Sequence, residues 1–543
     1  MIYPADEDSK GQSVFYNEVQ VQNRDLSILM LSLYSERRAV RKAVAQQKAL
    51  LRQRNHDAPK EQRLNNAQIQ EKLDAFRDNL NPSQTAQELE KEKDGMTILD
   101  ALAASGLRSM RYWNEIPAVK HVTINDLEEA AVERAKTNIS NNNLMDHLIS
   151  PENELVVPAH DKESAPQRPP GIAVHHGDAK LEMYMSQRPQ TLRIHNAIQQ
   201  KLKPQWDVID LDPYGSAAPF LDAAIQAIEN GGMLCITCTD MAALGGSHPE
   251  TCYGRYASMP IPNARYLQEV ALRILMCSMA TTAAKYGRTI KPILSVGMDF
   301  YIRCFVEVYD DKAGVNKLSL NIGHVYQSTQ CPSFYTATHG RLGGKKGTVY
   351  QPERAPPVPQ CEETGAEFKV AGPLWLAPLH DKDVVNEALK RVSGNKNNSN
   401  KDDSNIKVLP DMKWIATRAR LEGLLTSVSE ELDNVPLYYG LLNAGYKVSG
   451  YHKDPQAIKT DAPNRFMWDI LRAWVKKNPL KNDPQEGSAA AKILAVEPTS
   501  EIDFTIPKSL KQSSSSSSSG KKVSRFPMNP QSQWGPKAKA SGD

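Results

Sequence analysis

The stretch DVIDLDPYGSAAPFLDAAIQAI, from Asp207 to Ile228, decides the fold class. Residues 208–211 form a short, mostly apolar run that is typical of a buried parallel strand, and the apolar spacing over residues 223–228 is typical of a helix. The turn DPYG at 212–215 therefore occupies the carboxyl end of a strand, where open α/β sheets bind their ligands. We expect a ligand site at this turn.

The same alternation of strand and helix patterns continues on both sides of this stretch. The segments MTILDALAASG, VKHVTINDL, GIAVHHGDA and GGMLCITCTD predict strands, and helical patterns lie between them. Such alternation predicts a doubly wound α/β fold with a parallel sheet. The segment PILSVGMDFYIRCFVEVYD, residues 292–310, predicts two further strands joined as a hairpin at the sheet edge.

The chain is too long for a single domain, because 543 residues exceed the size at which one core stops growing. Changes of composition predict five segments. They are an amino-terminal segment at 1–34, a charged helical insertion at 35–93, the sheet domain at 94–310, a second domain of strands and helices at 311–500, and a serine-rich linker with a basic tail at 501–543.

Composition excludes several classes of protein. No apolar run approaches the ~20 residues of a membrane span, and seven cysteines are too sparse for a disulfide framework. The amino terminus has neither a secretory signal nor a transit peptide pattern, so we expect an intracellular protein. The net charge is only +3, but basic residues gather at 35–54 and after Lys508. A solvated surface and a nucleic-acid contact both explain these basic runs.

The first strand-to-helix turn, Asp100 to Arg108, lies where a Rossmann-type sheet binds a nucleotide. Only Gly106 matches the dinucleotide fingerprint, which favours an adenosine cofactor without a diphosphate. Asp126 ends the second strand, where an acid binds ribose hydroxyls, and Asp178 and Ala179 end the third, where an adenine amino group can be bound. Each acid alone is also explained as a helix cap, but acids at consecutive strand ends favour a shared ligand.

The triplet Asp212-Pro213-Tyr214 fits an enzyme that alkylates an exocyclic base amine. The lone pair of such an amine is delocalised into the ring, so the enzyme needs acceptors that orient its protons. Asp212 offers a carboxylate, Pro213 a rigidly placed carbonyl, and Tyr214 a stacking surface for an extruded base. A helix cap with proline in the first turn and a magnesium-binding aspartate are the alternatives, and the latter lacks a phosphate-binding loop.

The triplet resembles the Asn/Asp-Pro-Pro-Tyr signature of amino-group methyltransferases that use S-adenosylmethionine. Together with DALAASGLRSMRY, CTDMAALGG, AGPLW and RFPMNPQSQWGPKAKA, it makes most of the chain similar to the tRNA (guanine-26-N2)-dimethyltransferase family. This resemblance implies a Rossmann-like class I methyltransferase domain followed by a C-terminal α+β RNA-binding domain. It implies transfer of methyl groups from S-adenosylmethionine to N2 of guanosine 26 in tRNA, giving N2,N2-dimethylguanosine.

Other functions stay open beside this one. Within the methyltransferases, the alternative is a ribosomal guanine-N2 or adenine-N6 RNA methyltransferase. A nicotinamide-dependent oxidoreductase would need the missing glycine fingerprint, and a non-catalytic RNA-binding protein would not need an intact Asp212-Pro213-Tyr214. We expect a monomer with tRNA as its partner, no membrane association, and the nucleus as its location, with the mitochondrion as the alternative.

The predicted catalytic residues are Asp212, Pro213 and Tyr214. The predicted cofactor-binding residues are Arg24, Asp100, Gly106, Arg108, Asp126, Asp178 and Ala179. The resemblance implies Asp212 as the catalytic carboxylate and Arg24, Arg108, Asp126, Asp178 and Ala179 as the cofactor site, whereas the other four residues are predicted from their places in the turns after the strands. A role for Arg24 implies that residues 1–34 fold over the cofactor pocket and that the Arg24 guanidinium pairs with the methionine carboxylate.

No metal is expected. The family's second domain commonly carries paired Cys-x-x-Cys zinc ligands, but this chain has Ser328 with Cys331 and Cys361 with Thr364. A structural zinc normally needs four cysteine or histidine ligands, so the two remaining cysteines predict ordinary thiols. The histidines that could replace the missing ligands are His324, His339 and His380.

Overall fold

The computed structural model describes residues 20–91, 94–150, 153–155, 167–186, 203–393, 412–429 and 436–507. The serine-rich linker and the basic tail, both expected after residue 500, lie outside the described residues from 508 onward.

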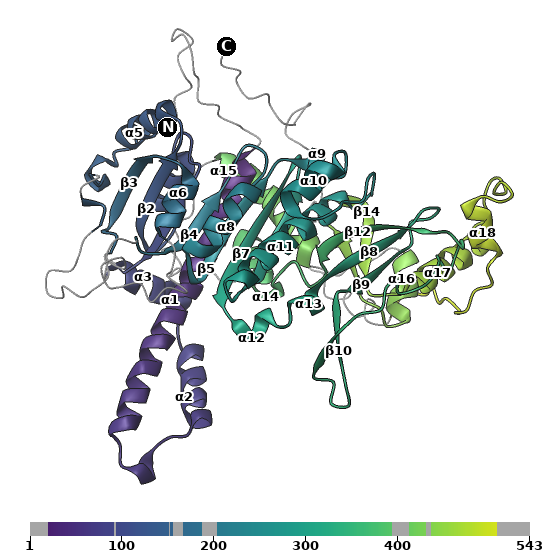
Figure 1. The fold of residues 1–543 in the computed structure, drawn as a ribbon, viewed down its shortest axis with the longest axis horizontal. Coiled ribbons are helices and arrows are strands. Elements are labelled where there is room, and N and C mark those ends of the chain that lie inside the picture. The colour runs from purple at the N-terminus through teal and green to yellow at the C-terminus, as the bar shows by residue number, and fades with distance from the viewer. Residues whose placement is uncertain are drawn as a thin grey trace, which may run out of the picture.

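The sheet domain is built on seven strands in the order β3-β2-β1-β4-β5-β7-β6 (Figure 1). Neighbouring strands from β3 to β5 are parallel, whereas β7 is antiparallel to both β5 and β6. The predicted α/β fold and the edge hairpin are therefore confirmed. The strands are β1 (Met96–Asp100), β2 (Val119–Asp126), β3 (Gly171–His176), β4 (Trp206–Leu211), β5 (Ile228–Cys238), β6 (Arg288–Met298) and β7 (Tyr301–Asp310).

Strand β4 lies in the middle of this sheet, and its apolar side chains Val208, Ile209 and Leu211 are fully buried. Burial on both faces is what a continuous apolar run in a parallel strand predicts. The chain leaves β4 through the DPYG turn and enters α8 (Ala218–Ala227), which has proline in its first turn, where no amide donor is needed. The opening stretch of sequence therefore adopts the predicted strand, turn and helix.

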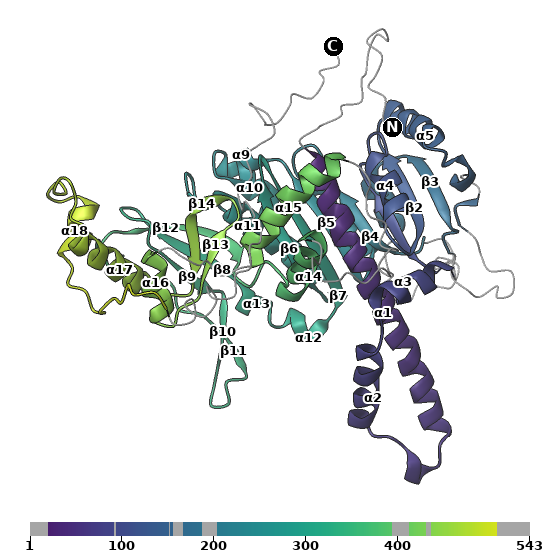
Figure 2. The ribbon, with the colours of Figure 1, turned by 180° about the vertical axis from the view of Figure 1, so that it is seen from behind.

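Two layers of helices cover the sheet. One face packs against α8 and α11 (Leu267–Lys285) in the largest hydrophobic cluster. The other face packs against α1 (Val21–Asp57), α14 (Lys382–Ser393) and α15 (Met412–Ser429), which Figure 2 shows crossing the back of the sheet. Smaller helices connect the strands: α4 (Leu107–Glu115), α5 (Glu129–Asn141), α6 (Ala179–Met185), α9 (Met241–Leu244) and α10 (Pro249–Tyr256).

The segments expected from composition differ from the structural units at two places. Helix α1 runs without a break across the expected boundary at residue 34. Helices α14 and α15, which fall in the expected second domain, bury Val385, Ala388 and Leu421 in the same cluster as Leu31 of α1 and Ile293 of β6. The core of the sheet domain therefore includes helices from the sequence on both sides of residues 94–310.

A helical arm projects from the body of the protein (Figure 1). It consists of the second half of α1, the short helix η2 (Lys60–Gln62) and α2 (Asn66–Asp78), and α3 (Pro82–Lys91) returns the chain to the body. Asn65 and Gln68 start α2 with a reciprocal capping box. The arm falls within residues 35–93, for which the sequence predicts a charged helical insertion.

The C-terminal part is α+β, as expected. A three-stranded sheet in the order β12-β8-β9 adjoins the sheet domain, and α17 and α18 lie at the far end of the molecule (Figure 1). Its elements are α12 (Lys312–Val315), α13 (Leu318–Asn321), β8 (Ile322–Ser328), β9 (Phe334–Thr338), β10 (Gly340–Gly343), β11 (Val349–Pro352), β12 (Phe368–Trp375), α16 (Pro436–Asn443), β13 (Val448–Tyr451), β14 (Asp454–Thr460), α17 (Asn464–Lys477) and α18 (Ala489–Ala495). Among the described residues, no helix combines the length and the apolar character that crossing a membrane requires.

Candidate active site

Four aspartates meet at the carboxyl edge of the sheet. Asp100 and Asp126 are the last residues of β1 and β2, Asp178 follows β3, and Asp212 follows β4. The strands are parallel neighbours in register, with Asp100 opposite Asp210, so their ends share one edge. The structure thus brings the acids predicted from the sequence to one side of the domain.

The loop after β1, residues 101–106, is hydrogen-bonded to the end of β2. The backbone N–H of Ala104 donates to Asp126 Oδ2 at 2.7 Å, and the backbone N–H of Ala103 donates to the carbonyl of Asn125 at 2.9 Å. Gly106 has a φ of 70°, and a Cβ there would lie 3.2 Å from Ala135 Cβ. Gly106 is therefore needed both for the left-handed turn and for the close approach of α4 to α5.

Asp126 and Asp178 each stabilise the start of the following turn. Asp126 Oδ1 accepts from the N–H of Glu128 at 3.0 Å, and Asp178 Oδ1 accepts from the N–H of Lys180 at 2.7 Å as the cap of α6. Ala179, the first residue of α6, is buried. The helix-cap alternative is thus correct for Asp178 and does not conflict with a ligand role, because a carboxylate has several acceptor positions.

Asp212 contacts helix α4 through Arg108. Its Oδ2 accepts from Arg108 Nη2, and its side chain is 21% exposed. Pro213 is buried, whereas Tyr214 is 68% exposed. The predicted catalytic carboxylate therefore lies at the edge of the interior, and the predicted stacking ring faces outward.

The turn that carries Tyr214 is held from the side of β5. The N–H of Gly215 donates to Thr239 Oγ1 at 2.8 Å, and the N–H of Thr239 donates to the carbonyl of Gly215 at 2.9 Å. Ser216 Oγ and the hydroxyl of Tyr256 are 2.6 Å apart, and that hydroxyl also donates to the carboxylate of Asp240. These contacts fix the backbone beneath an exposed aromatic ring, which is the arrangement a stacking platform needs.

A buried ionic network that the sequence analysis did not identify lies beneath this turn. Asp210, in β4, is fully buried and accepts from Arg303 Nη1 at 2.8 Å and Arg303 Nη2 at 2.9 Å. It also accepts from Arg108 Nη1 at 3.3 Å and from the hydroxyl of Tyr112. Burial would raise the pKa of Asp210, but the charges of Arg303 and Arg108 outweigh burial and hold the pKa below its usual range.

Asp100 has a different environment from the other acids. Its side chain is buried, and Ser109 Oγ in α4 donates to its Oδ2 at 2.7 Å. Burial and the nearby charge of Asp210 raise the pKa of Asp100 to about 7. The structure therefore places Asp100 under helix α4, where it joins the end of β1 to that helix.

The first turns of α1 reach this network. Ser27 Oγ accepts from Arg303 Nη2 at 2.9 Å and from Arg108 Nη1 at 3.4 Å, and Asn23 Nδ2 donates to Thr237 Oγ1 at 3.4 Å. Arg24 lies between these two residues in sequence and is mostly buried. Helix α1, which carries Arg24, and helix α4, which carries Arg108, therefore meet at the same edge of the sheet although they are far apart in sequence.

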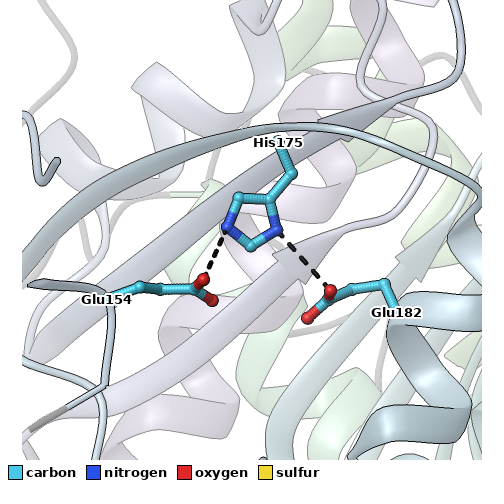
Figure 3. Close-up of side chains that lie close together, drawn as sticks. All are labelled: Glu154, His175 and Glu182. Atoms are coloured by element: carbon cyan, nitrogen blue, oxygen red, sulfur yellow. Dashed lines mark ion pairs between the residues drawn. The ribbon is translucent and has the colours of Figure 1, made fainter. Parts of the chain in front are cut away.

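A second ionic cluster holds α6 in place (Figure 3). His175 of β3 lies 3.0 Å from Glu154 Oε2 and 3.7 Å from Glu182 Oε2, and Lys203 Nζ lies 2.8 Å from Glu182 Oε2. Burial would lower the pKa of His175, but hydrogen bonds and charges of both glutamates outweigh it and raise the pKa to about 9. Three of these side chains have the spacing of metal ligands, but Lys203 already supplies the second positive charge that balances the two carboxylates.

A signal for the buried network exists in the sequence. Asp210 and Arg303 interrupt strand segments whose other central residues are apolar, and a charge in a buried strand needs an opposite charge nearby. That reasoning identifies both residues as buried but does not pair them, because they are 93 positions apart.

A family model described as N2,N2-dimethylguanosine tRNA methyltransferase matches residues 6–163 and 183–472. The chain belongs to this family. It is 36% identical to the tRNA (guanine(26)-N(2))-dimethyltransferase of Schizosaccharomyces pombe, with 98% of this chain and 90% of that protein covered. It is 34% identical to the enzyme of that name from Mus musculus, with 98% of this chain and 75% of that protein covered.

A solved structure has the same fold. The structure of Trm1 from Pyrococcus horikoshii with S-adenosyl-L-methionine aligns with a TM-score of 0.55 and 23% identity, and the alignment covers 86% of this chain and 96% of the archaeal chain. The family's fold therefore extends over the C-terminal part as well as the sheet domain.

Proposed function

We propose that the protein transfers methyl groups from S-adenosylmethionine to N2 of guanosine 26 in tRNA and forms N2,N2-dimethylguanosine. The observation that carries this proposal is the Asp212-Pro213-Tyr214 turn at the end of β4, beside the strand-end acids Asp126 and Asp178, in a chain of this family. The relatives named for the same reaction come from fungi and animals and match nearly the whole chain.

The donor site lies at the ends of β1, β2 and β3. Asp126 binds the ribose hydroxyls, Asp178 and the backbone of Ala179 bind the adenine edge, and Arg24 pairs with the methionine carboxylate. Gly106 lets the loop after β1 come close to the donor. The bound donor supplies an electrophilic methyl group on a sulfonium, so the protein's task is to position the amine.

The acceptor site is the turn after β4. Arg108 holds Asp212 Oδ2, which leaves Oδ1 to accept a proton of the guanine N2 amine. The carbonyl of Pro213 accepts the other amine hydrogen, and Tyr214 stacks on the extruded base. After the first transfer, the spent donor would be exchanged for a second S-adenosylmethionine. Rotation of the monomethyl amine would then present its one remaining N–H to Asp212, so one site performs both methylations. Most of the acceleration comes from proximity and orientation.

Nucleoside analysis of tRNA incubated with labelled methyl donor tests the function. We expect labelled N2,N2-dimethylguanosine from a tRNA with guanosine 26 and none from the same tRNA with adenosine 26. Label in N6-methyladenosine, or in ribosomal RNA but not in tRNA, would replace this function with the alternative RNA methyltransferases.

The role of Asp212 is tested by Asp212→Ala. This variant should lose dimethylguanosine formation and bind the donor almost as the unchanged protein does, because Asp212 lies on the acceptor side. Asp78→Ala is the matched control, since Asp78 is an exposed aspartate in the arm whose ion pair within the described residues is with the neighbouring Arg77. Full activity of Asp212→Ala would remove Asp212 from the mechanism.

We further propose that the protein acts as a monomer in the nucleus. One relative, from Saccharomyces cerevisiae, is named as mitochondrial and is 29% identical over 98% of this chain. A fluorescent fusion at the carboxyl terminus distinguishes the two compartments. Light scattering of the purified protein, with and without tRNA, measures the oligomeric state.

A further inference from the structure

Two thiols touch in the C-terminal part of the protein. Cys331 lies in the turn between β8 and β9, and Cys361 lies in the loop before β12. Their Sγ atoms are 3.5 Å apart although the residues are 30 positions apart, and the two residues are 8% and 2% exposed. The contact therefore joins two separate loops inside the protein.

Each cysteine lies in a turn that backbone hydrogen bonds close. In one loop the N–H of Ser328 donates to the carbonyl of Ser333 at 2.9 Å. In the other, the N–H of Cys361 donates to the carbonyl of Ala366 at 2.9 Å, and Gly365 closes the turn with a φ of 66°. Each loop is thus a closed turn that presents its cysteine to the other loop.

The two sulfurs have polar neighbours. Hydrogen bonds from Thr364, Ser328 and the backbone of Glu363 outweigh burial and lower the pKa of Cys361. In contrast, burial raises the pKa of Cys238, Cys252 and Cys277 to about 12. Cys361 is therefore the cysteine best prepared to react as a thiolate.

The pair lies at the seam between two parts of the C-terminal region. The two cysteines belong to one hydrophobic cluster with Ile493 of α18, and Trp468 of α17 packs against this cluster. Trp468 Nε1 donates to Ser333 Oγ at 2.7 Å, in the same turn as Cys331. Glu363, in the turn of Cys361, pairs with Arg472 of α17. A bond between the sulfurs would link the two turns against which α17 and α18 dock.

We propose that Cys331 and Cys361 form a dithiol that hydrogen peroxide oxidises reversibly to a disulfide, which clamps these two turns together. The Cys361 thiolate attacks one oxygen of the peroxide, the O–O bond breaks, and hydroxide leaves. The Cys331 sulfur then attacks the resulting sulfenic sulfur and loses its proton, and the S–O bond breaks to release water. Two thiols lose two electrons in total, and one peroxide becomes two waters.

The geometry favours this chemistry over metal binding. A disulfide needs the sulfurs to approach to roughly 2.05 Å, and they are already in contact. A tetrahedral zinc site needs four cysteine or histidine ligands, whereas Ser328 and Thr364 offer hydroxyls at the other two positions around Cys361.

Peptide mapping of the full chain tests the proposal. The reduced protein is titrated with hydrogen peroxide, remaining thiols are alkylated, and the digest is analysed by mass spectrometry. We expect a peptide pair linked through Cys331 and Cys361, two hydrogens lighter than the thiols, at lower peroxide than any modification of Cys252 or Cys277. Dithiothreitol should remove the link, and the linked protein should melt roughly 5 °C higher. Alkylation of both cysteines while another cysteine is oxidised would overturn the proposal.

Two variants distinguish disulfide formation from oxidation of single thiols. In Cys331→Ser, Cys361 should stop at the sulfenic acid and react with dimedone, whereas the matched control Cys277→Ser should still form the link. If Cys331→Ser does not fold, the peptide map of the unchanged protein after peroxide treatment still shows whether Cys331 and Cys361 form a disulfide. Retention of one equivalent of added zinc by the reduced protein, with protection of both thiols from alkylation, would identify a metal site and refute the proposal.

Discussion

The substitution Asp210→Asn tests the buried network beneath the turn after β4, residues 212–215. In the protein, Asp210 is the carboxylate that neutralises Arg303, whose side chain is completely buried. The asparagine removes the negative charge and keeps the shape. Arg303 would then have only uncharged acceptors in the described residues: the amide oxygen of the new side chain and the hydroxyls of Thr237 and Ser27. The variant thus leaves a buried positive charge without an opposite charge.

The expected loss of stability follows from this geometry. Removing one partner of a buried ion pair costs about 3–5 kcal/mol, since the other charge remains desolvated. For a domain of this size, each kcal/mol lowers the melting temperature by roughly 2–4 °C, so we expect a decrease of roughly 10 °C. The relevant comparison is Asp212→Asn, because Asp212 shares Arg108 with Asp210 but is partly exposed. Loss of the Asp212 charge should lower the free energy of unfolding by about 1 kcal/mol or less.

Thermal unfolding and methyl transfer, measured on the same two proteins, separate stability from catalysis. Asp210→Asn should melt early but retain activity at temperatures where it is folded. Asp212→Asn should melt close to the unchanged protein and form no dimethylguanosine. A melting temperature of Asp210→Asn within 2 °C or so of the unchanged protein would refute the reasoning, because Arg303 would then not depend on Asp210.

Three further predictions concern other parts of the site. His175 has a pKa of about 9, above its unfolded value of roughly 6.5, so its protonation contributes up to about 3 kcal/mol to the free energy of unfolding below pH 6.5, and this contribution is lost as the pH rises through 9. In His175→Gln, the free energy of unfolding should therefore depend less on pH, and denaturant unfolding at pH 6 and 9.5 measures this. Gly106→Ala should lower the melting temperature, because it places a Cβ at a φ of 70° beside Ala135, and an unchanged value would exclude this strain. Tyr214→Ala should raise the KM for tRNA roughly tenfold or more, since stacking contributes about 1–3 kcal/mol per base, while donor affinity stays the same; equal KM values would exclude stacking.

The sequence predicts the sheet domain well because its strands are apolar runs that end in distinct turns. The residues 207–228 form the predicted strand, turn and helix, and the two strands within 292–310 form the predicted edge hairpin. The strand-end acids Asp126 and Asp212 were predictable for the same reason, since the carboxyl ends of parallel strands share one edge.

The helices that complete the core were not predictable from local pattern. Helices α1, α14 and α15 cover one face of the sheet, but their residues lie outside 94–310 and their partners are distant in sequence. Composition marked a boundary at residue 34, yet α1 continues through it because its first turns pack on the sheet and its last turns extend into the arm. Tertiary packing decides such boundaries.

The antiparallel strand β7, which lies between β5 and the edge strand β6, also contributes to the buried network beneath the site. Arg303 lies opposite Thr237 of β5, and its guanidinium donates to that hydroxyl and to Asp210 in β4, one strand further on. The same guanidinium donates to Ser27, so β4, β5, β7 and α1 meet at one charged group. Asp210 and Asp212 follow the period of two of a strand, and both contact Arg108. Arg108 therefore joins the buried Asp210 to Asp212, the carboxylate that we propose contacts the substrate.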